Sequence, residues 1–279
     1  MHTCERIEDI ILRHSKRGMD ILSENMDYDC CHEAARLILS WDKGNVFLTT
    51  GFYANDCAET DGPAGTVVLA KALQTLGYHP VIITDKYCKG FFEIEELDII
   101  YMPVMAGIDF VEQTIGKYNP VGMISIERCG RNADNDYANM KGISIKEYTA
   151  KTDLFFEAAA GKISTIGIGD GGNEIGMGNA ANLISEKIGL VPCIVCVDCL
   201  VIATVSNWGA YGVATYLGLI TGRRLMAGFE EIKAYISKTV GIGSVDGVLG
   251  ERIEGVDGFG MDTEKEIVDA LCTVHRHFN

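Results

Sequence analysis

The stretch STIGIGDGGNEIG, residues 164–176, passes from a short apolar run directly into a loop of glycines, acids and one amide. An apolar run of this length, followed at once by glycines, is typical of a buried strand. The glycines indicate that the backbone turns at positive φ or comes close to a neighbouring group. Because the loop also carries acids, a bare phosphate is not its expected ligand. The stretch therefore predicts a strand whose carboxyl end opens onto a functional loop.

The same change from an apolar run to a polar segment recurs along the chain. Further strands are expected at NVFLTT (45–50), PVIITD (80–85), DIIYMP (98–103), VGMISI (121–126) and CIVCV (193–197). Helical patterns fall near 5–14, 31–41, 63–78, 109–118, 150–160, 178–189, 207–220, 229–240 and 262–278. Alternating helices and fully apolar strands predict a three-layer α/β fold, with a largely parallel sheet covered by helices on both faces. We expect a single domain over residues 1–279.

The composition limits the classes of partner. The chain has 39 Asp and Glu residues against 24 Lys and Arg residues, a formal net charge of −15 and a pI near 4.8. Such a balance argues against nucleic acid or an anionic membrane as a partner. The first residues, MHTCERIEDI, do not resemble a signal peptide, and the sequence contains no unbroken apolar run long enough for a membrane helix. We therefore expect a soluble cytoplasmic protein, and a homo-oligomer is compatible with the sequence.

The ten cysteines raise the question of a metal site, because Cys193, Cys196 and Cys199 are spaced by three and Cys30 and Cys31 are adjacent. The segment around the first three is rich in β-branched residues and is typical of a strand. Neighbouring positions of a strand alternate between faces, so Cys193 and Cys196 would point in opposite directions. We expect reduced cysteines in the core.

Five polar segments each follow a predicted strand, namely GFYANDCAETDGP, KYCKG, ERCGRNADNDY, GDGGNEIG and SNWGAYG. In an open parallel sheet the carboxyl ends of all strands share one edge, and ligands bind in the crevice there. We therefore expect the functional site at this edge. The glycine- and acid-rich segment 242–260 is expected to be an exposed functional loop or a lid.

Two of these segments carry candidate charged groups. Pro63 suits the first turn of a helix that Asp61 would complement, which leaves Glu59 free to bind an ammonium group or a metal. Arg128 and Arg131 would hold a carboxylate in a bidentate manner, and the alternative is a surface cluster of ion pairs. Glu127, beside them, would act as a charge partner or a base.

The last two segments supply the remaining candidates. Asp170 would project from its strand into the crevice, and Asn173 would cap a helix that begins near Glu174. Ser206 and Asn207 would cap the helix of residues 208–220, or its free amides would hold an anion. The glycine loop lacks the G-K-[ST] of a P-loop and comes too late in the chain for a dinucleotide fingerprint, so no nucleotide cofactor is expected.

Taken in order, four groups of residues resemble the D-glutamate cyclase family. They are GFY with ETDGP (51–63), SIERCGR with DNDYANMKG (125–142), GDGGNEIGMGN (169–179) and SNWGAYG (206–212), and the resemblance spans roughly residues 30–260. Vertebrate members are mitochondrial and carry such a domain at the C-terminal end, so we expect this chain to resemble a stand-alone bacterial version. Asn135 stands where the family has glycine, and asparagine tolerates the same left-handed backbone.

The resemblance implies a lyase that converts D-glutamate to 5-oxo-D-proline and water, with the α-amine attacking the γ-carboxyl group. Arg128 and Arg131, with Ser206 and Asn207, would bind the substrate. The other roles are then expected as follows: Glu59, Asp61 or Glu127 binds the ammonium group and removes its proton, Asp170 contributes to catalysis, and Asp170, Asn173 and Glu174 place a divalent cation, Mn²⁺ or Mg²⁺, as Lewis acid.

Two alternatives remain open from the sequence. A metal-dependent enzyme acting on a phosphorylated small molecule would use the same acids. A non-catalytic sensor of dicarboxylic amino acids would use the same arginines.

Overall fold

The computed structural model describes residues 5–26 and 29–277 of the chain, with side chains described up to residue 274. One sheet of six parallel strands has the order β5-β4-β1-β6-β7-β8. These strands are β1 (Asn45–Thr49), β4 (His79–Thr84), β5 (Asp98–Tyr101), β6 (Gly122–Ile126), β7 (Ser164–Gly169) and β8 (Cys199–Ile202). The predicted three-layer α/β fold is thus confirmed.

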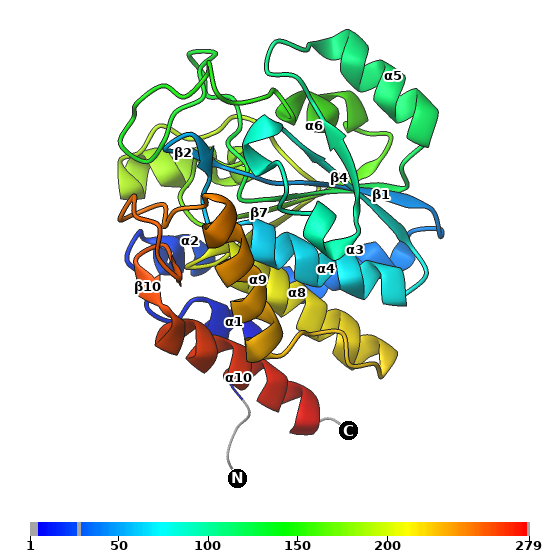
Figure 1. Cartoon of the computed structure of the whole chain (residues 1–279), viewed down its shortest axis with the longest axis vertical. Coiled ribbons are helices and arrows are strands. Elements are labelled where there is room, and N and C mark those ends of the chain that lie inside the picture. The colour runs from blue at the N-terminus through cyan, green and yellow to red at the C-terminus, as the bar shows by residue number, and fades with distance from the viewer. Residues whose placement is uncertain (1–4, 27–28, 278–279) are drawn as a thin grey trace.

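The two faces of the sheet are covered by different helices. Figure 1 shows α4 (Pro63–Thr75), α8 (Ser206–Thr221), α9 (Phe229–Ile242) and α10 (Met261–His277) on one side, and α5 (Ile108–Tyr118) and α6 (Asp153–Ala159) on the other. The first face is completed by α1 (Ile7–Ile11) and α3 (Cys30–Ser40), whose apolar residues belong to the same core cluster. On the second face α2 (Met19–Ser23) contacts β8, and its Met19 and Leu22 belong to the same core cluster as the apolar residues of α5 and α6. Residue 278 of the expected last helix lies outside the described residues.

Several short elements connect the strands and the longer helices. They are β2 (Tyr53–Ala54), β3 (Cys57–Ala58), η1 (Lys86–Cys88), η2 (Glu93–Glu95), η3 (Met177–Ala180), α7 (Ala181–Leu183), η4 (Ile184–Ile188), β9 (Gly255–Val256) and β10 (Phe259–Gly260). The helix expected over 178–189 is therefore a succession of 3-10, α and π turns. The π turn ends at Gly189, which has a φ of +73°.

The prediction of a strand at CIVCV (residues 193–197) is wrong. Residues 193–197 are extended, but they bond to loops: Cys193 N–H donates to Gly172 O and Ile194 N–H donates to Arg131 O. The last strand of the six-stranded sheet is β8, which begins at Cys199. Cys193 and Cys199 are buried as expected, whereas Cys196 is exposed, since its segment crosses the edge of the sheet instead of entering it.

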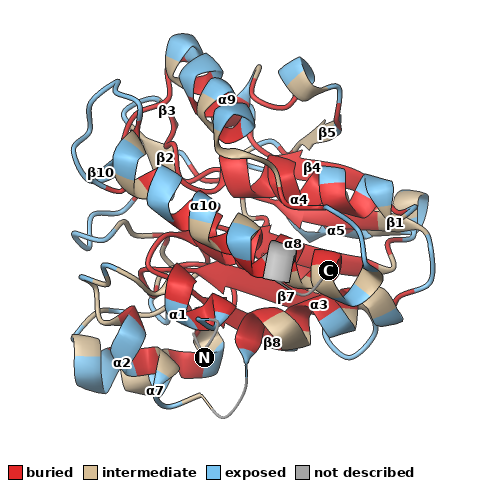
Figure 2. Ribbon diagram, turned by 90° about the horizontal axis from the view of Figure 1, so that it is seen from below, coloured by how far each residue is buried: buried red, intermediate tan, exposed pale blue. Residues whose placement is uncertain are grey.

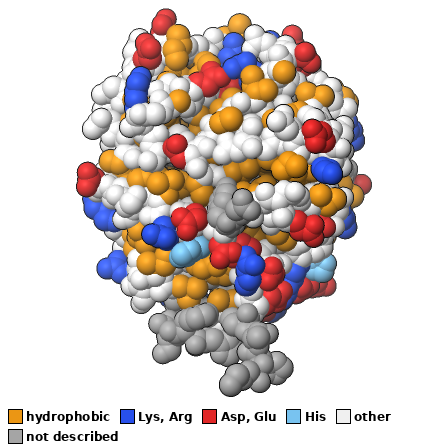
Figure 3. Space-filling model, turned by 180° about the vertical axis from the view of Figure 1, so that it is seen from behind, with side chains coloured by type: hydrophobic (Ala, Val, Ile, Leu, Met, Phe, Trp, Pro, Cys, Tyr) orange, Lys and Arg blue, Asp and Glu red, His pale blue; other side chains and the backbone are white. Residues whose placement is uncertain are grey.

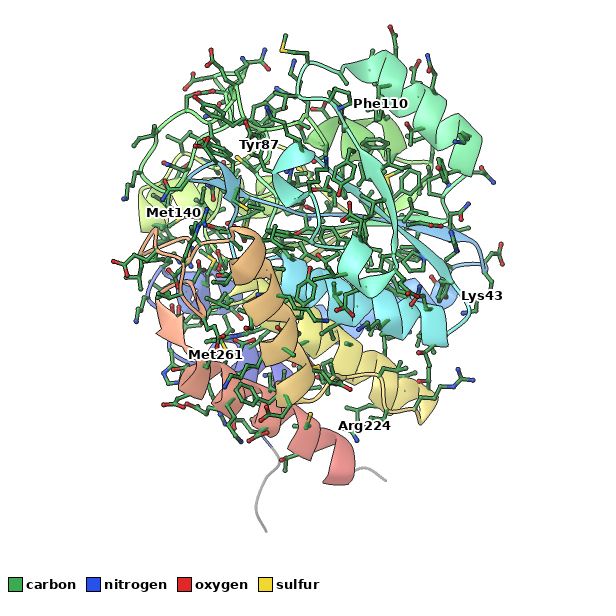
Figure 4. The ribbon with its side chains drawn as sticks, viewed as in Figure 1. Lys43, Tyr87, Phe110, Met140, Arg224 and Met261 are labelled. Carbon is green, nitrogen blue, oxygen red and sulfur yellow. The ribbon has the colours of Figure 1, made fainter. Side chains whose placement is uncertain are left out.

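The strand order places a crevice in the middle of the sheet. The chain runs from β1 outward to β4 and β5, then returns to β6 on the other side of β1 and continues to β7 and β8. Loops after β1 and β6 therefore leave in opposite directions, and ligands bind at such a switch point. Figure 4 shows Met140 near this carboxyl edge and Lys43, just before β1, at the opposite end.

Burial follows from this layering. In Figure 2 the inner strands of the sheet are buried along most of their length, whereas the edge strand β5 is half-buried or exposed, and exposed residues lie on the outer sides of the helices. On the face shown in Figure 3, acidic, basic and apolar side chains are interspersed. Among the described residues, no helix combines the length and the apolar character needed to cross a membrane.

Helices α4 and α8 are in close contact at Gly65. A Cβ atom added at Gly65 would lie 2.9 Å from both Ala210 Cβ and Asn207 Cα. Both neighbours belong to the buried first half of α8, so neither can move aside without shifting the helix. Glycine at position 65 therefore sets the spacing of the two helices that flank the crevice.

We predict that Gly65→Ala destabilises the protein by about 1–3 kcal/mol, because the added methyl overpacks the α4–α8 contact. Gly116→Ala is the matched control: Gly116 lies in α5, and an added Cβ there meets no atom within 4 Å. The control should stabilise the protein by about 0.5–1 kcal/mol through helix propensity. Urea denaturation of both variants measures the difference, and equal effects would contradict the packing argument.

Candidate functional site

The carboxyl edge of the sheet holds a cluster of buried acids around one arginine. Six carboxylates are each no more than 8% exposed, and they come from four segments of the chain: Glu59 and Asp61, Glu127, Asp170 and Glu174, and Asp257. The sequence predicted the first five as site residues, and the structure brings them to one edge of the sheet. Such a concentration of buried acids is costly unless cations or protons compensate it.

Arg17 supplies the positive charge. Its guanidinium donates to both oxygens of Asp170, at 3.0 and 3.2 Å, and to Asp257. Arg17 precedes α2, whereas Asp257 lies between β9 and β10, so one side chain joins the N-terminal and C-terminal parts of the chain to the end of β7. Sequence reasoning missed Arg17 because nothing around it resembles a motif. Sequence reasoning did not single out Asp257 either, but it did predict that the segment 242–260, which contains Asp257, is a functional loop.

Asp61 joins the N-termini of two helices. Its carboxylate accepts hydrogen bonds from the backbone N–H groups of Ser206 (2.9 Å), Asn207 (2.8 Å) and Gly62 (2.9 Å). The amide oxygen of Asn207 in turn accepts from the N–H groups of Gly62 and Gly65 at the start of α4. The amides at the starts of α4 and α8 are thus bonded to protein groups.

The expected roles of Ser206 and Asn207 therefore change. Helix α8 begins at Ser206 itself, and its N-cap residue is Val205, so the predicted capping by the side chains of Ser206 and Asn207 is wrong. The anion held by its amides is the carboxylate of Asp61, and neither residue lines the cavity described below. Their positions indicate a supporting role instead of direct contact with substrate.

Glu127 has an unusual backbone conformation. It follows β6 with a φ of +45°, which side-chain-bearing residues adopt at a cost of about 1–2 kcal/mol. The turn brings its carboxylate to Ser206, whose hydroxyl donates to Oε2 at 2.6 Å. A Cβ atom at Gly62 would lie 2.8 Å from the Cβ of Glu127, so the glycine of ETDGP makes room for this residue. Backbone strain of this kind clusters at functional sites.

The glycine loop after β7 is shaped by close approach. A Cβ atom at Gly171 would lie 2.6 Å from Met140 Sδ and 2.7 Å from Glu174 Oε1. Gly172 and Gly176 have φ values of +105° and +106°. The two expected reasons for glycine in this loop, a backbone at positive φ and the close approach of a neighbouring group, are both confirmed. Gly172 N–H donates to Glu174 Oε2, while Glu174 Oε1 is buried without a hydrogen-bond partner among the described residues.

The side chain of Asn173 does not cap a helix, and no helix begins near Glu174 in the described residues, contrary to the prediction. Residues 171–176 form a loop, and the first 3-10 turn begins at Met177. The side-chain NH₂ of Asn173 donates instead to Ala138 O at 2.8 Å. This bond ties the glycine loop to the segment that follows β6.

The two arginines expected to hold substrate carboxylates lie elsewhere. The guanidinium of Arg128 is 1% exposed and donates to Asp85, Thr152 and the backbone oxygens of residues 51 and 150. Arg131 pairs with Glu157 on the surface. Both arginines follow a buried strand, as the sequence showed, but buried Arg128 finds its partners within the protein, and Arg131 does not line the cavity described below.

A cavity of about 640 Å³ opens beside the acid cluster. Arg17, Glu59, Glu127 and Asp257 line it, together with residues of three loops: 52–55, 139–148 and 247–250. The segment 242–260 thus contributes to the cavity, as expected of a functional loop. Figure 4 shows Met140, one of the lining residues, on the side of the molecule where β2 and β10 lie.

Burial and mutual repulsion shift the acids toward their protonated forms. Burial, followed by the charges of Asp257 and Asp61, raises the pKa of Glu59 well above its ordinary value. Burial raises the pKa of Asp61 to about 8, although its bonded amides oppose the shift. Burial also raises the pKa of Glu127, with repulsion from Glu174 as the next cause. Some of these groups therefore carry protons near neutral pH, which is the condition for acid and base roles within one site.

The acids also match the ligand preferences of a hard cation. Asp61, Glu127 and Asp170 each offer a carboxylate oxygen within 4.8 Å of the others. Oxygen ligands of this kind suit Mg²⁺, Mn²⁺ or Ca²⁺. Of the expected metal ligands, Asp170 belongs to this group and Glu174 does not, while the side-chain NH₂ of Asn173 is bonded to Ala138 O.

Comparison with known proteins identifies the family. A family model described as D-glutamate cyclase-like, C-terminal, matches residues 7–272. The chain belongs to the D-glutamate cyclase-like family. The mitochondrial D-glutamate cyclase of Homo sapiens is 33% identical to it over 202 residues. The match covers 63% of this chain and 33% of the human protein, so the chain spans about a third of that relative.

A solved structure gives a weaker match to this D-glutamate cyclase-like chain. The Bordetella bronchiseptica enzyme WbmG in complex with NAD aligns with a TM-score of 0.32 and 12% identity, over 63% of this chain and 49% of that one. This similarity is too low to inform the ligand of the present site.

The raised pKa values predict how stability depends on pH. In the absence of divalent cations, the folded cluster holds protons that the unfolded chain has released, so the free energy of unfolding should fall from about pH 5 to about pH 8. The slope reaches about 1.4 kcal/mol per pH unit for each such proton. Glu59→Gln should give a shallower slope, because it removes one buried acid. Urea denaturation across this range tests both statements, and parallel curves would contradict the second.

Proposed function

We propose that this protein is a lyase that converts D-glutamate to 5-oxo-D-proline and water. The observation that carries the proposal is the pair Glu59 and Glu127, two carboxyl groups of raised pKa that line one cavity. Membership of the D-glutamate cyclase-like family supports the same reaction class. Cyclisation of an amino acid onto its own side chain requires a base and an acid in one small site, and this pair supplies both.

The reaction makes three chemical demands. The α-ammonium group loses two protons in all, its nitrogen forms a bond to the γ-carboxyl carbon, and one γ-oxygen takes up two protons and leaves as water. An ionised member of the Glu59–Glu127 pair accepts a proton from the nitrogen, and a protonated member delivers one to the leaving oxygen. Two such transfers balance the reaction and return the pair to its starting state. Asp61 does not line the cavity, and its oxygens already accept three amide bonds, so we assign it a positioning role.

Charge on the γ-carboxylate must also be reduced before the amine attacks. Arg17 lines the cavity and contributes positive charge at its base. The oxygens of Asp61, Glu127 and Asp170 fit a divalent cation, which when bound would supply Lewis-acid chemistry and offset the repulsion among the acids. Binding of such a cation is part of the proposal.

The first experiment is to incubate the purified protein with D-glutamate or L-glutamate, in the presence of Mn²⁺ or of a chelator, and to follow 5-oxoproline by mass spectrometry. We expect product from the D-isomer, with less product when the chelator is present. Saturable binding of glutamate without product would favour a sensor. Neither product nor binding would favour a phosphorylated ligand, and in both cases the proposed reaction would be rejected.

Two variants then test whether Glu127 takes part in proton transfer. Glu127→Gln should lower kcat/KM by about 10²–10⁴-fold, because a glutamine at this position cannot exchange a proton. Arg131→Gln is the control, since Arg131 pairs with Glu157 away from the cavity and its loss should leave the kinetics unchanged. Circular dichroism checks that both variants fold. Activity retained in Glu127→Gln would exclude this residue from proton transfer.

A further inference from the structure

The segment of residues 138–148, called here the rim loop, forms one side of the cavity mouth. It contributes several lining residues, among them Asn139, Met140, Lys141 and Tyr148. Tyr148 stacks on Tyr53 with ring centroids 4.4 Å apart, which joins the rim loop to the loop after β1. The rim loop therefore contacts the wall of the cavity to which Tyr53 belongs.

The rim loop is held at both its backbone and its side chains. Ala138 O accepts the bond from Asn173 described above, and Asn139 Oδ1 accepts the N–H groups of Lys141 (2.9 Å) and Ile143 (3.1 Å). Met140 Sδ occupies the space left by the missing side chain of Gly171. The backbone of Lys141 is thus fixed relative to the glycine loop that carries Asp170.

Lys141 and Arg17 are the two cations that line the cavity within the described residues. Arg17 already pairs with Asp170 and Asp257. Lys141 forms no ion pair with any residue in the described part of the chain, although three carboxylates line the same cavity. Its ammonium group is therefore available to an anionic group of a ligand.

We propose that Lys141 binds the α-carboxylate of the substrate at the mouth of the cavity. The inference rests on the proposed function. The reacting amine and γ-carboxyl group must lie near Glu59, Glu127 and Arg17, at the acid cluster. Lys141, which is exposed on the rim loop, then faces the α-carboxylate, which takes no part in bond formation.

If Lys141 binds the α-carboxylate, it determines how strongly the protein prefers a substrate with a negative charge at the α-position, and this preference can be measured. The α-amide of D-glutamate, D-isoglutamine, keeps the amine and the γ-carboxyl group but has no negative charge at the α-position. The wild-type protein should prefer D-glutamate to D-isoglutamine, and the preference should reside in KM. A hydrogen-bonded charge pair of this kind corresponds to about a tenfold to hundredfold difference.

The test measures kcat and KM for both substrates in wild-type protein, Lys141→Met and Lys141→Arg. Lys141→Met should raise the KM for D-glutamate about tenfold or more, leave kcat and the kinetics of D-isoglutamine nearly unchanged, and so remove the discrimination. Lys141→Arg, which keeps the positive charge, should retain most of the preference for D-glutamate over D-isoglutamine. Lys89→Met, which alters an exposed lysine outside the cavity lining, is the control and should retain the full preference.

The outcomes distinguish the two proposals. If the wild-type protein cyclises D-glutamate but Lys141→Met keeps the full preference over D-isoglutamine, the role of Lys141 is overturned and the proposed function stands. If the wild-type protein forms no 5-oxoproline, the function fails, and calorimetry with glutarate tests Lys141 separately. Weaker glutarate binding by Lys141→Met than by Lys89→Met would still support carboxylate recognition by Lys141, and equal binding would overturn it.

Discussion

The pairing of Arg17 with Asp170 and Asp257 is the interaction on which the rest of the site depends. Buried carboxylates repel one another in a medium of low polarity, and an uncompensated cluster would open or take up protons. Arg17 lowers this cost and at the same time joins the segment before α2, the end of β7 and the β9–β10 region. The remaining imbalance appears as raised pKa values, which are what proton transfer in a neutral solution requires.

Asp61 supplies the second constraint, because it orders the helices that border the crevice. The amides at the start of α8 bond to its carboxylate, and the amides at the start of α4 bond to Asn207. In a dinucleotide-binding fold with this strand order, the N-terminus of the helix after the first strand faces a pyrophosphate. Here the same amides face protein oxygens, and the crevice beside them is lined by acids instead.

The glycines near the site make these contacts possible. Gly62 admits the side chain of Glu127, Gly65 admits α8, and Gly171 admits both Met140 and Glu174. Except for the contact between Gly171 and Glu174, which lies within one loop, these contacts join segments that are distant in sequence. The loop GDGGNEIG therefore carries its acids because it lies beside a cavity rich in charge, and it carries its glycines because the rim loop and Glu174 pack directly against its backbone.

The sequence by itself determined the layers of the fold, since the apolar runs and the helical periodicity report local burial, and it placed Glu59, Glu127 and Asp170 at one edge because parallel strands end together. It misplaced the last strand at 193–197, where apolar residues pack against loops. The roles of Arg128, Arg17 and Lys141 depended on partners far along the chain. A guanidinium after a buried strand has no local signal that separates an internal partner from a ligand, so only the tertiary structure decided which cation faces the cavity.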